Sequence, residues 1–293
     1  MADQQIDLSL QRLFGLSGAG AYKQKVAVVT GGGTGIGKMI ASALAQNGAR
    51  VYIASRKLNV VSAAAADINA NPQTIASGGS CIALQADLTD KAKVQAFANE
   101  IKKREEKVHV LVNNAGMSWG SDLLEFDEKN GWDRLFALNV KGPFYLTTAL
   151  VGQLENGASN LDPGRVINIS SIASVVPGSV DPTGTDTSSY NASKAALNHL
   201  TRVLAATLSG RCITVNAIAP GFYPSRMTQH GIEALGDDIA VGQPMGRIGS
   251  TEDMAGLALF LSSRASAHIT GQVIMTDGGY SLCYAAGSHV AKL

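Results

Sequence analysis

Tyr190 and Lys194 are the two residues whose types and spacing point most directly to acid–base chemistry. They stand four positions apart at the start of a run, 189–209, that is expected to be helical. Residues i and i+4 lie on one face of a helix, one turn apart. A neighbouring ammonium group stabilises a phenolate, which lowers the pKa of tyrosine from about 10 toward the range of a working acid–base catalyst. The pair is therefore predicted to transfer a proton, although its spacing alone is a weak signal.

A glycine-rich turn, Thr30-Gly31-Gly32-Gly33-Thr34-Gly35-Ile36-Gly37, joins the first expected strand to the first expected helix. Glycines in this place let backbone amides approach a pyrophosphate at the positive end of the helix dipole. The spacing is Gly-x-x-x-Gly-x-Gly, so the Gly-x-Gly-x-x-Gly fingerprint is absent from this turn. We expect Gly31, Thr34, Gly35, Ile36 and Gly37 to bind a dinucleotide cofactor. A purely structural turn is the alternative.

The second expected strand ends in Ser55-Arg56-Lys57, where a dinucleotide would place its adenine ribose. An acidic residue there accepts a hydrogen bond from a free 2′-hydroxyl group. A hydroxyl group followed by two basic side chains suits a 2′-phosphate instead, because a guanidinium group binds phosphate through two hydrogen bonds. These residues predict NADP(H) in preference to NAD(H). The alternative is a solvated basic helix start.

Composition excludes several other classes of protein. The 293 residues include 24 Lys and Arg against 23 Asp and Glu, a net charge of +1, whereas a dedicated nucleic-acid binder has a strongly basic face. Three widely spaced cysteines and five scattered histidines predict neither a disulfide framework nor a metal site. No stretch approaches the roughly 18 apolar residues of a membrane helix. We therefore expect no nucleic-acid partner, no membrane span and no metal.

Short apolar runs alternate along the chain with longer helical ones, and Val26-Ala27-Val28-Val29 is apolar throughout, as in a strand buried on both faces. Expected strands are 25–30, 50–55, 80–86, 108–113, 165–170, 212–217 and 272–276; expected helices are 36–47, 58–70, 91–105, 128–153, 189–209 and 251–262. This alternation predicts an α/β fold, a Rossmann-like doubly wound parallel sheet of about seven strands with helices on both faces. We expect one catalytic domain at 25–284, between an N-terminal extension at 1–24 and a C-terminal tail at 285–293.

Taken together and in order, these motifs resemble those of the short-chain dehydrogenase/reductase family over nearly the whole chain. The matching pieces are Thr30 to Gly37, Asp87-Leu88, Asn113-Asn114-Ala115-Gly116, Asn139-Val140, Ile169-Ser170-Ser171, Tyr190 with Lys194, Asn216 to Gly221, and Thr276-Asp277-Gly278-Gly279. The segment from Ile218 to Thr228, with Pro244-Met245-Gly246-Arg247, is most similar to 3-oxoacyl reductases of the rhamnolipid type.

The resemblance implies catalytic roles for four residues. Ser171 would hydrogen-bond the substrate carbonyl group, and Tyr190 would donate a proton as hydride arrives from the nicotinamide. Lys194 would bind the nicotinamide ribose and tune Tyr190, while Asn139 would fix a water molecule in the proton path. Ser170, the first serine of its pair, is expected to be structural.

The resemblance also implies a longer cofactor site. Asp87 would hold the adenine amino group with Leu88 beside the ring, and Pro220 and Gly221 would begin the segment that binds the carboxamide. Further cofactor residues implied in this way are Asn113, Ala115, Gly116, Tyr190, Lys194 and Ser225, the last standing where relatives often have threonine.

The substrate is expected to be a ketone, either a 3-oxoacyl thioester or another bulky ketone on an apolar chain. A turn-rich loop at 173–189 is expected to overhang the site or to be a harmless surface insertion. Trp119 and Tyr223 are expected to form the wall of the substrate pocket or simply to pack. Alternatives are an alcohol dehydrogenase of polyol, sugar or steroid type, and a non-catalytic NADP-binding protein.

Two further expectations concern chemistry and location. Gly116-Met117-Ser118-Trp119-Gly120 matches the Gly-x-Ser-x-Gly motif of hydrolases, but that motif needs a sharp strand-to-helix turn at the serine. The chain stops at Ala291-Lys292-Leu293, which is similar to the peroxisomal address Ser-Lys-Leu. We expect the protein in peroxisomes or in the cytoplasm, and the family resemblance implies a homodimer or homotetramer.

Overall fold

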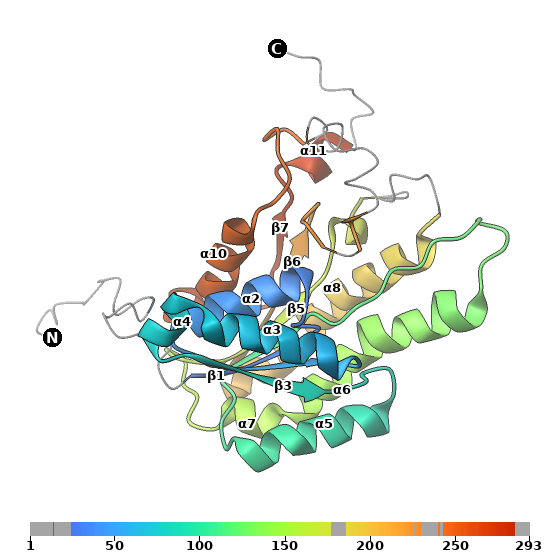
Figure 1. Cartoon of the computed structure of the whole chain (residues 1–293). Helices are drawn as coiled ribbons and strands as arrows, with labels where there is room; N and C mark the ends of the chain where they lie inside the picture. Colours follow the sequence, from blue (N-terminus) through green and yellow to red (C-terminus); the bar gives the residue numbers. More distant parts are fainter. Residues whose placement is uncertain are drawn as a thin grey trace, which may run out of the picture.

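A single parallel sheet with helices on both sides forms the body of the protein, as predicted (Figure 1). The computed structural model of the chain describes residues 14, 25–176, 186–225, 227–229, 240 and 243–284. Seven strands lie in the order β3-β2-β1-β4-β5-β6-β7, and every neighbouring pair is parallel. The strands are β1 (Val26–Thr30), β2 (Arg50–Ser55), β3 (Ser80–Gln85), β4 (Val110–Asn113), β5 (Gly164–Ile169), β6 (Ile213–Pro220) and β7 (Val273–Thr276).

The helices follow the predicted runs except in one region. They are α2 (Gly35–Gln46), α3 (Leu58–Ala70), α4 (Pro72–Ser77), α5 (Lys91–Arg104), α6 (Gly142–Ala149), α7 (Val151–Glu155), α8 (Ser188–Leu208), α10 (Thr251–Ser262) and α11 (Tyr280–Tyr284). The predicted helix at 128–153 was wrong as one regular element, because wider π-helical turns occupy Glu128–Arg134 and Ala137–Lys141 ahead of α6 and α7. Outside the predicted runs the structure adds two short helices, α4 and α11, which were not predicted.

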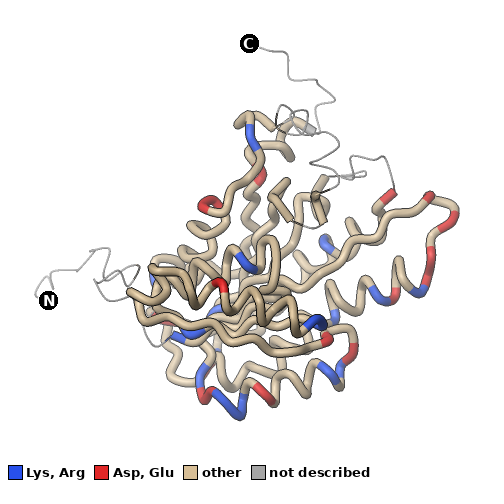
Figure 2. The backbone as a smooth tube through the Cα atoms, in the orientation of Figure 1, with Lys and Arg blue, Asp and Glu red and all other residues tan. Residues whose placement is uncertain are grey.

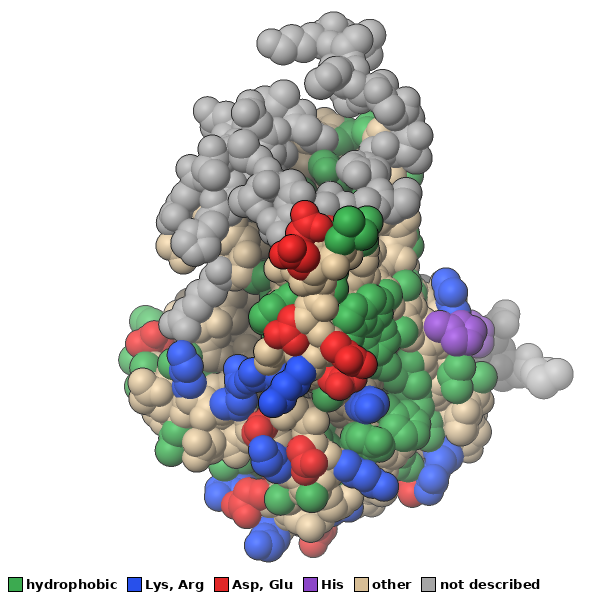
Figure 3. Space-filling model, turned by 90° about the vertical axis from the view of Figure 1, so that its right-hand side faces the viewer, with side chains coloured by type: hydrophobic (Ala, Val, Ile, Leu, Met, Phe, Trp, Pro, Cys, Tyr) green, Lys and Arg blue, Asp and Glu red, His purple; other side chains and the backbone are tan. Residues whose placement is uncertain are grey.

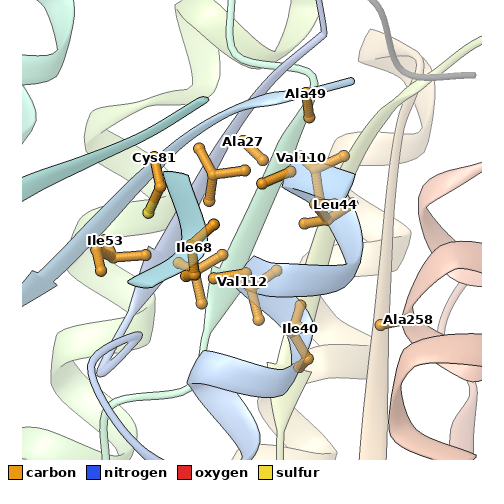
Figure 4. Packing of buried hydrophobic residues seen from close by; sticks show 14 of the residues in the cluster. Ala27, Ile40, Leu44, Ala49, Ile53, Ile68, Cys81, Val110, Val112 and Ala258 are labelled. Carbon is orange, nitrogen blue, oxygen red and sulfur yellow. The ribbon is translucent and has the colours of Figure 1, made fainter. Parts of the chain in front are cut away.

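Alternate residues of each central strand enter two separate cores. Ala27 and Val29 pack with Leu44 on the side that α2, α3 and α10 cover (Figure 4). Val26 and Val28 face the opposite side and pack with residues of α5, α6, α7 and α8. Because both faces are covered, the central strands are apolar at nearly every position. This explains why they were readable as continuous hydrophobic runs.

The two halves of the sheet meet between β1 and β4. From β1 the chain proceeds outward to β2 and β3, returns to β4 beside β1, and then proceeds in the other direction. Parallel sheets of this kind bind ligands in the crevice outside the carboxyl ends of the strands, where the order reverses. The glycine-rich turn after β1 and the segment after β4 both lie at this crevice.

Lys and Arg positions alternate with Asp and Glu positions along the described backbone in the view of Figure 2. Within that part of the chain, no helix is long and apolar enough to cross a membrane and no cluster of metal-binding side chains occurs. Three features predicted from the sequence fall outside the described residues: the N-terminal extension at 1–24 apart from residue 14, the middle of the predicted loop at 177–185, and the tail at 285–293 with its terminal tripeptide Ala291-Lys292-Leu293.

A partly buried ionic network lies at the amino ends of the strands, away from the crevice. Asp162 accepts from Arg165 at 2.9 Å, from Arg264 at 3.1 Å and from Lys25 at 3.5 Å. Beside this network the Nδ1 atom of His109 accepts a hydrogen bond from the backbone N–H of Val26 at 3.0 Å. Burial first, and then the nearby cations, lower the pKa of His109 to about 4.

His109 is expected to make the stability of the protein fall as the pH is lowered from about 6.5 toward 4. The folded-state pKa lies below the ordinary value of about 6.5, so folding favours the neutral ring, and its contribution is full above pH 6.5. Urea unfolding midpoints measured across this range should show a decline that is smaller in His109→Asn, which keeps an acceptor but does not titrate. His268→Asn, at an exposed position, is the control and should retain the decline. An identical decline in His109→Asn would contradict the assignment.

Candidate active site

A cleft of about 690 Å³ opens at the carboxyl ends of β1, β2, β4 and β5. Its lining joins the glycine-rich turn, the basic turn after β2, the segment after β4 and the start of α8. The predicted site residues that line it are Gly31, Thr34, Gly35, Ile36, Ser55, Arg56, Lys57, Leu88, Ala115, Gly116, Tyr190, Lys194 and Ser225. Residues separated by up to 194 positions in the sequence thus share one cavity.

The glycine-rich turn is shaped by contacts that exclude side chains. Gly31 and Gly35 have φ angles of +66° and +52°, in the left-handed region that favours glycine. A Cβ atom on Gly37 would lie 2.4 Å from the carbonyl oxygen of Gly31 and 2.4 Å from Asn114 Nδ2. Gly37 does not line the cleft; it lets α2 begin directly behind the turn, with the helix N-terminus aimed at the cavity. This is the geometry of a phosphate-binding cradle.

Asn114 and Thr30 hold this cradle in place, and neither was assigned a role from the sequence. Asn114 Nδ2 donates to the carbonyl oxygens of Thr30 at 2.9 Å and Gly31 at 3.2 Å. Thr30 Oγ1 accepts from the backbone N–H groups of Asn114 and Ala115, each at 3.0 Å. The motif Asn113-Asn114-Ala115-Gly116 was the available signal, but it does not reveal which atoms it supports.

The basic turn lies at one end of the cleft. Ser55 Oγ donates to the carbonyl oxygen of Lys57 at 3.2 Å, and Gln85 Nε2 donates to that of Arg56 at 2.9 Å. The exposed side chains of Arg56 and Lys57 follow β2 directly, and among the described residues no acidic one lines the cavity. A cradle for a diphosphate and a cationic turn therefore occupy the same cleft. A nicotinamide dinucleotide with a 2′-phosphate fits these residues.

Tyr190, Ser171 and Lys194 come together beside the cradle. Tyr190 is buried in a small cluster with Leu135 and Ala173, while a hydrogen bond joins its hydroxyl group to Ser171. Lys194 Nζ lies 5.6 Å from the centroid of the Tyr190 ring and donates to the carbonyl oxygen of Ile169 at 2.9 Å. Tyr190 and the buried ammonium group of Lys194 thus lie one turn apart on α8, with the Ser171 hydroxyl group beside that of Tyr190.

The pKa of Tyr190 differs from the value predicted from the sequence. Burial raises the pKa of Tyr190, and the hydrogen bond with Ser171 only partly opposes this increase. The expected lowering by Lys194 was wrong for this state of the protein, because burial dominates and Lys194 Nζ donates to the carbonyl oxygen of Ile169. Burial also lowers the pKa of Lys194 to about 8. The hydroxyl group of Tyr190 is therefore protonated at neutral pH.

Asn139 lies one layer behind the reacting groups. Its amide donates to Met117 O at 2.9 Å and to Ser193 Oγ at 3.0 Å, while its Oδ1 atom accepts from Met117 N at 3.0 Å. Ser193 Oγ in turn donates to the carbonyl oxygen of Tyr190 at 2.8 Å. Asn139 therefore connects the segment after β4 to Ser193 in the second turn of α8. Met117 and Ser193 were not assigned these roles from the sequence.

Ser170 Oγ donates to the carbonyl oxygen of Lys194 at 3.3 Å, in line with its expected structural role.

Several predicted cofactor residues do not line the cleft. Asn113 is buried and donates to Thr147 Oγ1 at 3.1 Å and Asn168 Oδ1 at 2.9 Å, so its side chain joins the sheet to a helix. Asp87 accepts from Lys93 at 2.9 Å and from Thr89 at 2.7 Å. These two side chains are already bonded within the protein.

Pro220 and Gly221 end β6 beside β7, also outside the cavity lining. Pro220 pairs with Thr276. A Cβ atom on Gly221 would lie 2.8 Å from Asp277 Cβ. These two residues direct the following segment toward the cleft, which it reaches at Ser225 and Met227.

The two aromatic residues predicted to form the substrate wall have different surroundings. Trp119 is half-buried and packs against the cluster that contains Tyr190, close to the reacting groups. Tyr223 is buried in the core beneath α10, and its hydroxyl group lies 2.6 Å from Thr276 Oγ1. Tyr223 also borders a separate cavity of about 360 Å³. The expectation that Tyr223 forms the substrate wall was wrong, and the alternative of simple packing holds.

The remaining sequence expectations near the cleft have clear outcomes. Ser118 lines the cavity within an irregular segment, and no helix follows it directly, so the hydrolase arrangement is absent at this residue.

Of the predicted loop, residues 173–176 and 186–189 are described. Asp186 and Ser121 exchange two backbone hydrogen bonds of 3.1 Å, which tie the start of α8 to the segment after β4.

Comparison with known proteins agrees with this geometry. A protein-family profile described as Enoyl-(Acyl carrier protein) reductase matches residues 31–281. The rhamnolipids biosynthesis 3-oxoacyl-[acyl-carrier-protein] reductase of Pseudomonas aeruginosa is 41% identical over 261 residues, which cover 88% of this chain and 96% of that protein. The galactitol 2-dehydrogenase (L-tagatose-forming) of Cereibacter sphaeroides is 35% identical over 261 residues, covering 87% and 94%.

A solved structure gives the same result. The Pseudomonas aeruginosa RhlG/NADP active-site complex superposes with a TM-score of 0.82 at 38% identity, covering 91% of this chain and all of that one. Both the fold and the ordered motifs are therefore shared over nearly the full length. The chain belongs to the short-chain dehydrogenase/reductase family of nicotinamide-dependent oxidoreductases.

Proposed function

We propose that this enzyme reduces a ketone to a secondary alcohol with NADPH, in a reversible hydride transfer. One observation carries the proposal: Tyr190 and Lys194 line the same cleft as the glycine cradle and the basic turn at Arg56. A cofactor that rests its diphosphate on the cradle would lie between the cationic turn and the tyrosine. The ketone would then meet Tyr190 at the other end of the cleft.

The protein's residues act on the ketone oxygen and on the cofactor. When bound, the cofactor supplies the hydride. Tyr190 donates its phenolic proton to the carbonyl oxygen, which becomes the alcohol, and Ser171 hydrogen-bonds the same oxygen and orients it. Lys194 stabilises the phenolate that remains, because an ammonium group beside a buried anion favours its charged form. Asn139 fixes the position of Met117 relative to Ser193 of α8 through its two donated hydrogen bonds.

The basic turn is expected to set the choice between NADPH and NADH. Arg56→Asp replaces a phosphate-binding guanidinium group by a carboxylate, which repels a 2′-phosphate and accepts from a free 2′-hydroxyl group. The ratio of kcat/KM for NADPH to that for NADH should fall at least about tenfold, since hydrogen bonds to charged groups contribute roughly 1.5–3 kcal/mol. Steady-state kinetics with both cofactors measures this ratio. Lys38→Asp, on the outer side of α2, is a control with the same charge change and should leave the ratio unaltered. An unchanged ratio in Arg56→Asp would contradict the assignment.

For the substrate we propose a 3-oxoacyl thioester or another ketone on an apolar chain. The relative that is 41% identical bears the name of a 3-oxoacyl reductase. The apolar side chains of Met117, Leu138 and Met227 line the cleft and suit such a chain. The galactitol dehydrogenase favours a second candidate, a polyol or sugar alcohol. Purified protein with NADPH, tested against oxoacyl thioesters, cyclic ketones, quinones and keto-sugars, separates these candidates by kcat/KM. Tight NADPH binding without turnover of any ketone would favour the non-catalytic alternative.

We also propose that the protein assembles as a homodimer or homotetramer. Hydrophobic side chains gather on the face viewed in Figure 3, which corresponds to the right-hand side of Figure 1. Trp132, Phe144 and Val203 are large apolar residues with 38%, 39% and 48% of their surface exposed. They belong to the region of the predicted helix at 128–153 and to α8. Burying these side chains against a second copy would remove apolar surface from water.

A further inference from the structure

Two linked hydrogen bonds join α8 to the turn that carries Ser171, and no role assigned so far explains them. Asn198 is buried on α8, about two helical turns after Tyr190. Asn198 Nδ2 donates to Ser174 Oγ at 2.7 Å, and Ser174 Oγ donates to the carbonyl oxygen of Ser171 at 2.5 Å. The helix that carries the tyrosine therefore also holds the turn that carries the serine.

Counting protons fixes the direction of both bonds. The carbonyl oxygen of Ser171 can only accept, so the single hydroxyl proton of Ser174 is directed to it. Ser174 Oγ can then offer Asn198 only a lone pair, and Asn198 must present its amide nitrogen. The Oδ1 atom of Asn198 is buried and has no hydrogen-bond partner among the described residues. The contact with Ser174 thus needs a donor at position 198.

The turn that these bonds hold is short. Ser171 is the N-cap of the 3₁₀ turn Ile172–Ser174, and its carbonyl oxygen also accepts the backbone N–H of Ser174 at 3.0 Å. Hydrogen-bond geometry in a 3₁₀ turn is poorer than in an α-helix. The second bond to the Ser171 carbonyl oxygen, from Ser174 Oγ, therefore reinforces a turn that is weak by itself.

The same turn decides where the hydroxyl proton of Ser171 can point. Ser171 Oγ accepts the backbone N–H of Ala173 at 3.2 Å, which occupies one of its two lone pairs. Because this N–H is itself a donor, the Ser171 proton cannot point toward it. The Ser171 hydroxyl group is hydrogen-bonded to Tyr190 on its other side. An intact turn thus directs the serine proton to the place where the tyrosine acts.

We propose that Asn198 is a positioning residue that acts through Ser174 to orient the hydroxyl group of Ser171 toward the ketone oxygen. The inference rests on the proposed function, because it requires a ketone beside Ser171 and Tyr190. A hydrogen bond that strengthens as charge develops on the ketone oxygen accelerates the chemical step and contributes little to binding. Misplacement of Ser171 should therefore lower kcat and leave cofactor affinity unaltered.

Steady-state kinetics and NADPH titration of variants at position 174 test this role, with the ketone that the substrate screen selects. Ser174→Ala removes the bond to the Ser171 carbonyl oxygen and should lower kcat by about threefold to tenfold, since one neutral hydrogen bond is lost. The KM for the ketone and the Kd for NADPH should stay within about twofold of wild type. Ser174→Thr keeps the hydroxyl group and should hold kcat within about twofold of wild type, which links the loss in Ser174→Ala to the hydroxyl group.

A double-mutant cycle tests whether Asn198 acts through Ser174. Asn198→Leu keeps the branching of the side chain but cannot donate, so Ser174 is free to turn away from Ser171 and kcat should fall. In the Ser174→Ala background the same substitution should lower kcat by less than about twofold more, because no hydroxyl group is left to orient. If Asn198→Leu does not fold, the two variants at position 174 decide.

Matched controls lie away from the cleft. Ser209→Ala removes an exposed hydroxyl group that donates to the carbonyl oxygen three residues before it, as Ser174 does. Asn156→Leu removes an exposed amide that donates to the carbonyl oxygen of Glu106 at 3.1 Å. Both controls should leave kcat and the Kd for NADPH near wild-type values.

Three results would overturn the proposal: an unchanged kcat in Ser174→Ala, a Kd for NADPH that rises as much as kcat falls, or losses that multiply in the double variant. A wild-type protein that binds NADPH and reduces no ketone would instead overturn the proposed function, and this inference with it.

Discussion

Replacing Tyr190 by phenylalanine is expected to lower kcat for ketone reduction by about 10²- to 10⁴-fold, the usual contribution of a positioned acid. In the proposed reaction the hydroxyl group donates the proton, and burial raises its pKa, so it remains protonated at neutral pH. The Kd for NADPH should change little, because the ring stays in its cluster with Leu135 and Ala173. Steady-state kinetics and a cofactor titration on the same preparation separate the two quantities.

A matched tyrosine provides the control for this substitution. Tyr145 lies outside the cleft, where its ring packs edge-on against Phe144 at 5.6 Å. Tyr145→Phe should leave both kcat and the Kd for NADPH near wild-type values. If Tyr190→Phe retained more than about a tenth of wild-type turnover, Tyr190 would be excluded as the acid.

Replacing Lys194 by methionine is expected to lower kcat/KM by about 10²-fold and to weaken NADPH binding as well. The ammonium group is buried, and losing one hydrogen bond from a charged group costs roughly 1.5–3 kcal/mol. Methionine fills a similar volume, so the effect reports the charge rather than a cavity. Kinetics and cofactor titration should both change, unlike in Tyr190→Phe.

The pH dependence of the wild-type enzyme distinguishes this role further. Burial lowers the pKa of Lys194 to about 8 in the free enzyme, so the side chain is charged below pH 8 and neutral above it. If the charged form is the active one, kcat/KM for reduction should fall about tenfold per pH unit above pH 8. Lys194→Met should lack this decline. An alkaline decline that persists unchanged in Lys194→Met would show that another group titrates.

The sequence was sufficient to predict the sheet because its central strands are buried on both faces. Runs such as 26–29 are apolar at every position, and the glycine turn marks where the first strand ends. Ser55, Arg56 and Lys57 could be placed in the cleft because β2 neighbours β1, and parallel strands share one carboxyl edge. Residues that follow neighbouring parallel strands could therefore be predicted to lie close together.

Pairwise contacts between distant segments were not readable in this way. The hydrogen bonds of Asn114 to Thr30 and Gly31, and those of Asn139 to Met117, depend on side-chain directions that no periodicity encodes. Tyr223 was misplaced for the same reason, since an aromatic residue after a strand can face either the cleft or the core. The pKa of Tyr190 was misjudged because burial depends on the packed neighbours and not on the spacing to Lys194.

Hydride transfer to a ketone carbon is the central claim, and deuterium tracing tests it most directly. The wild-type protein would be incubated with NADPH deuterated at C4, in each of the two epimers, and with the ketone that the substrate screen selects. Mass spectrometry of the alcohol should then detect one deuterium atom at the carbinol carbon from one epimer only. If NADPH binds and neither epimer delivers deuterium to an alcohol product, the protein is not the reductase that its cleft predicts.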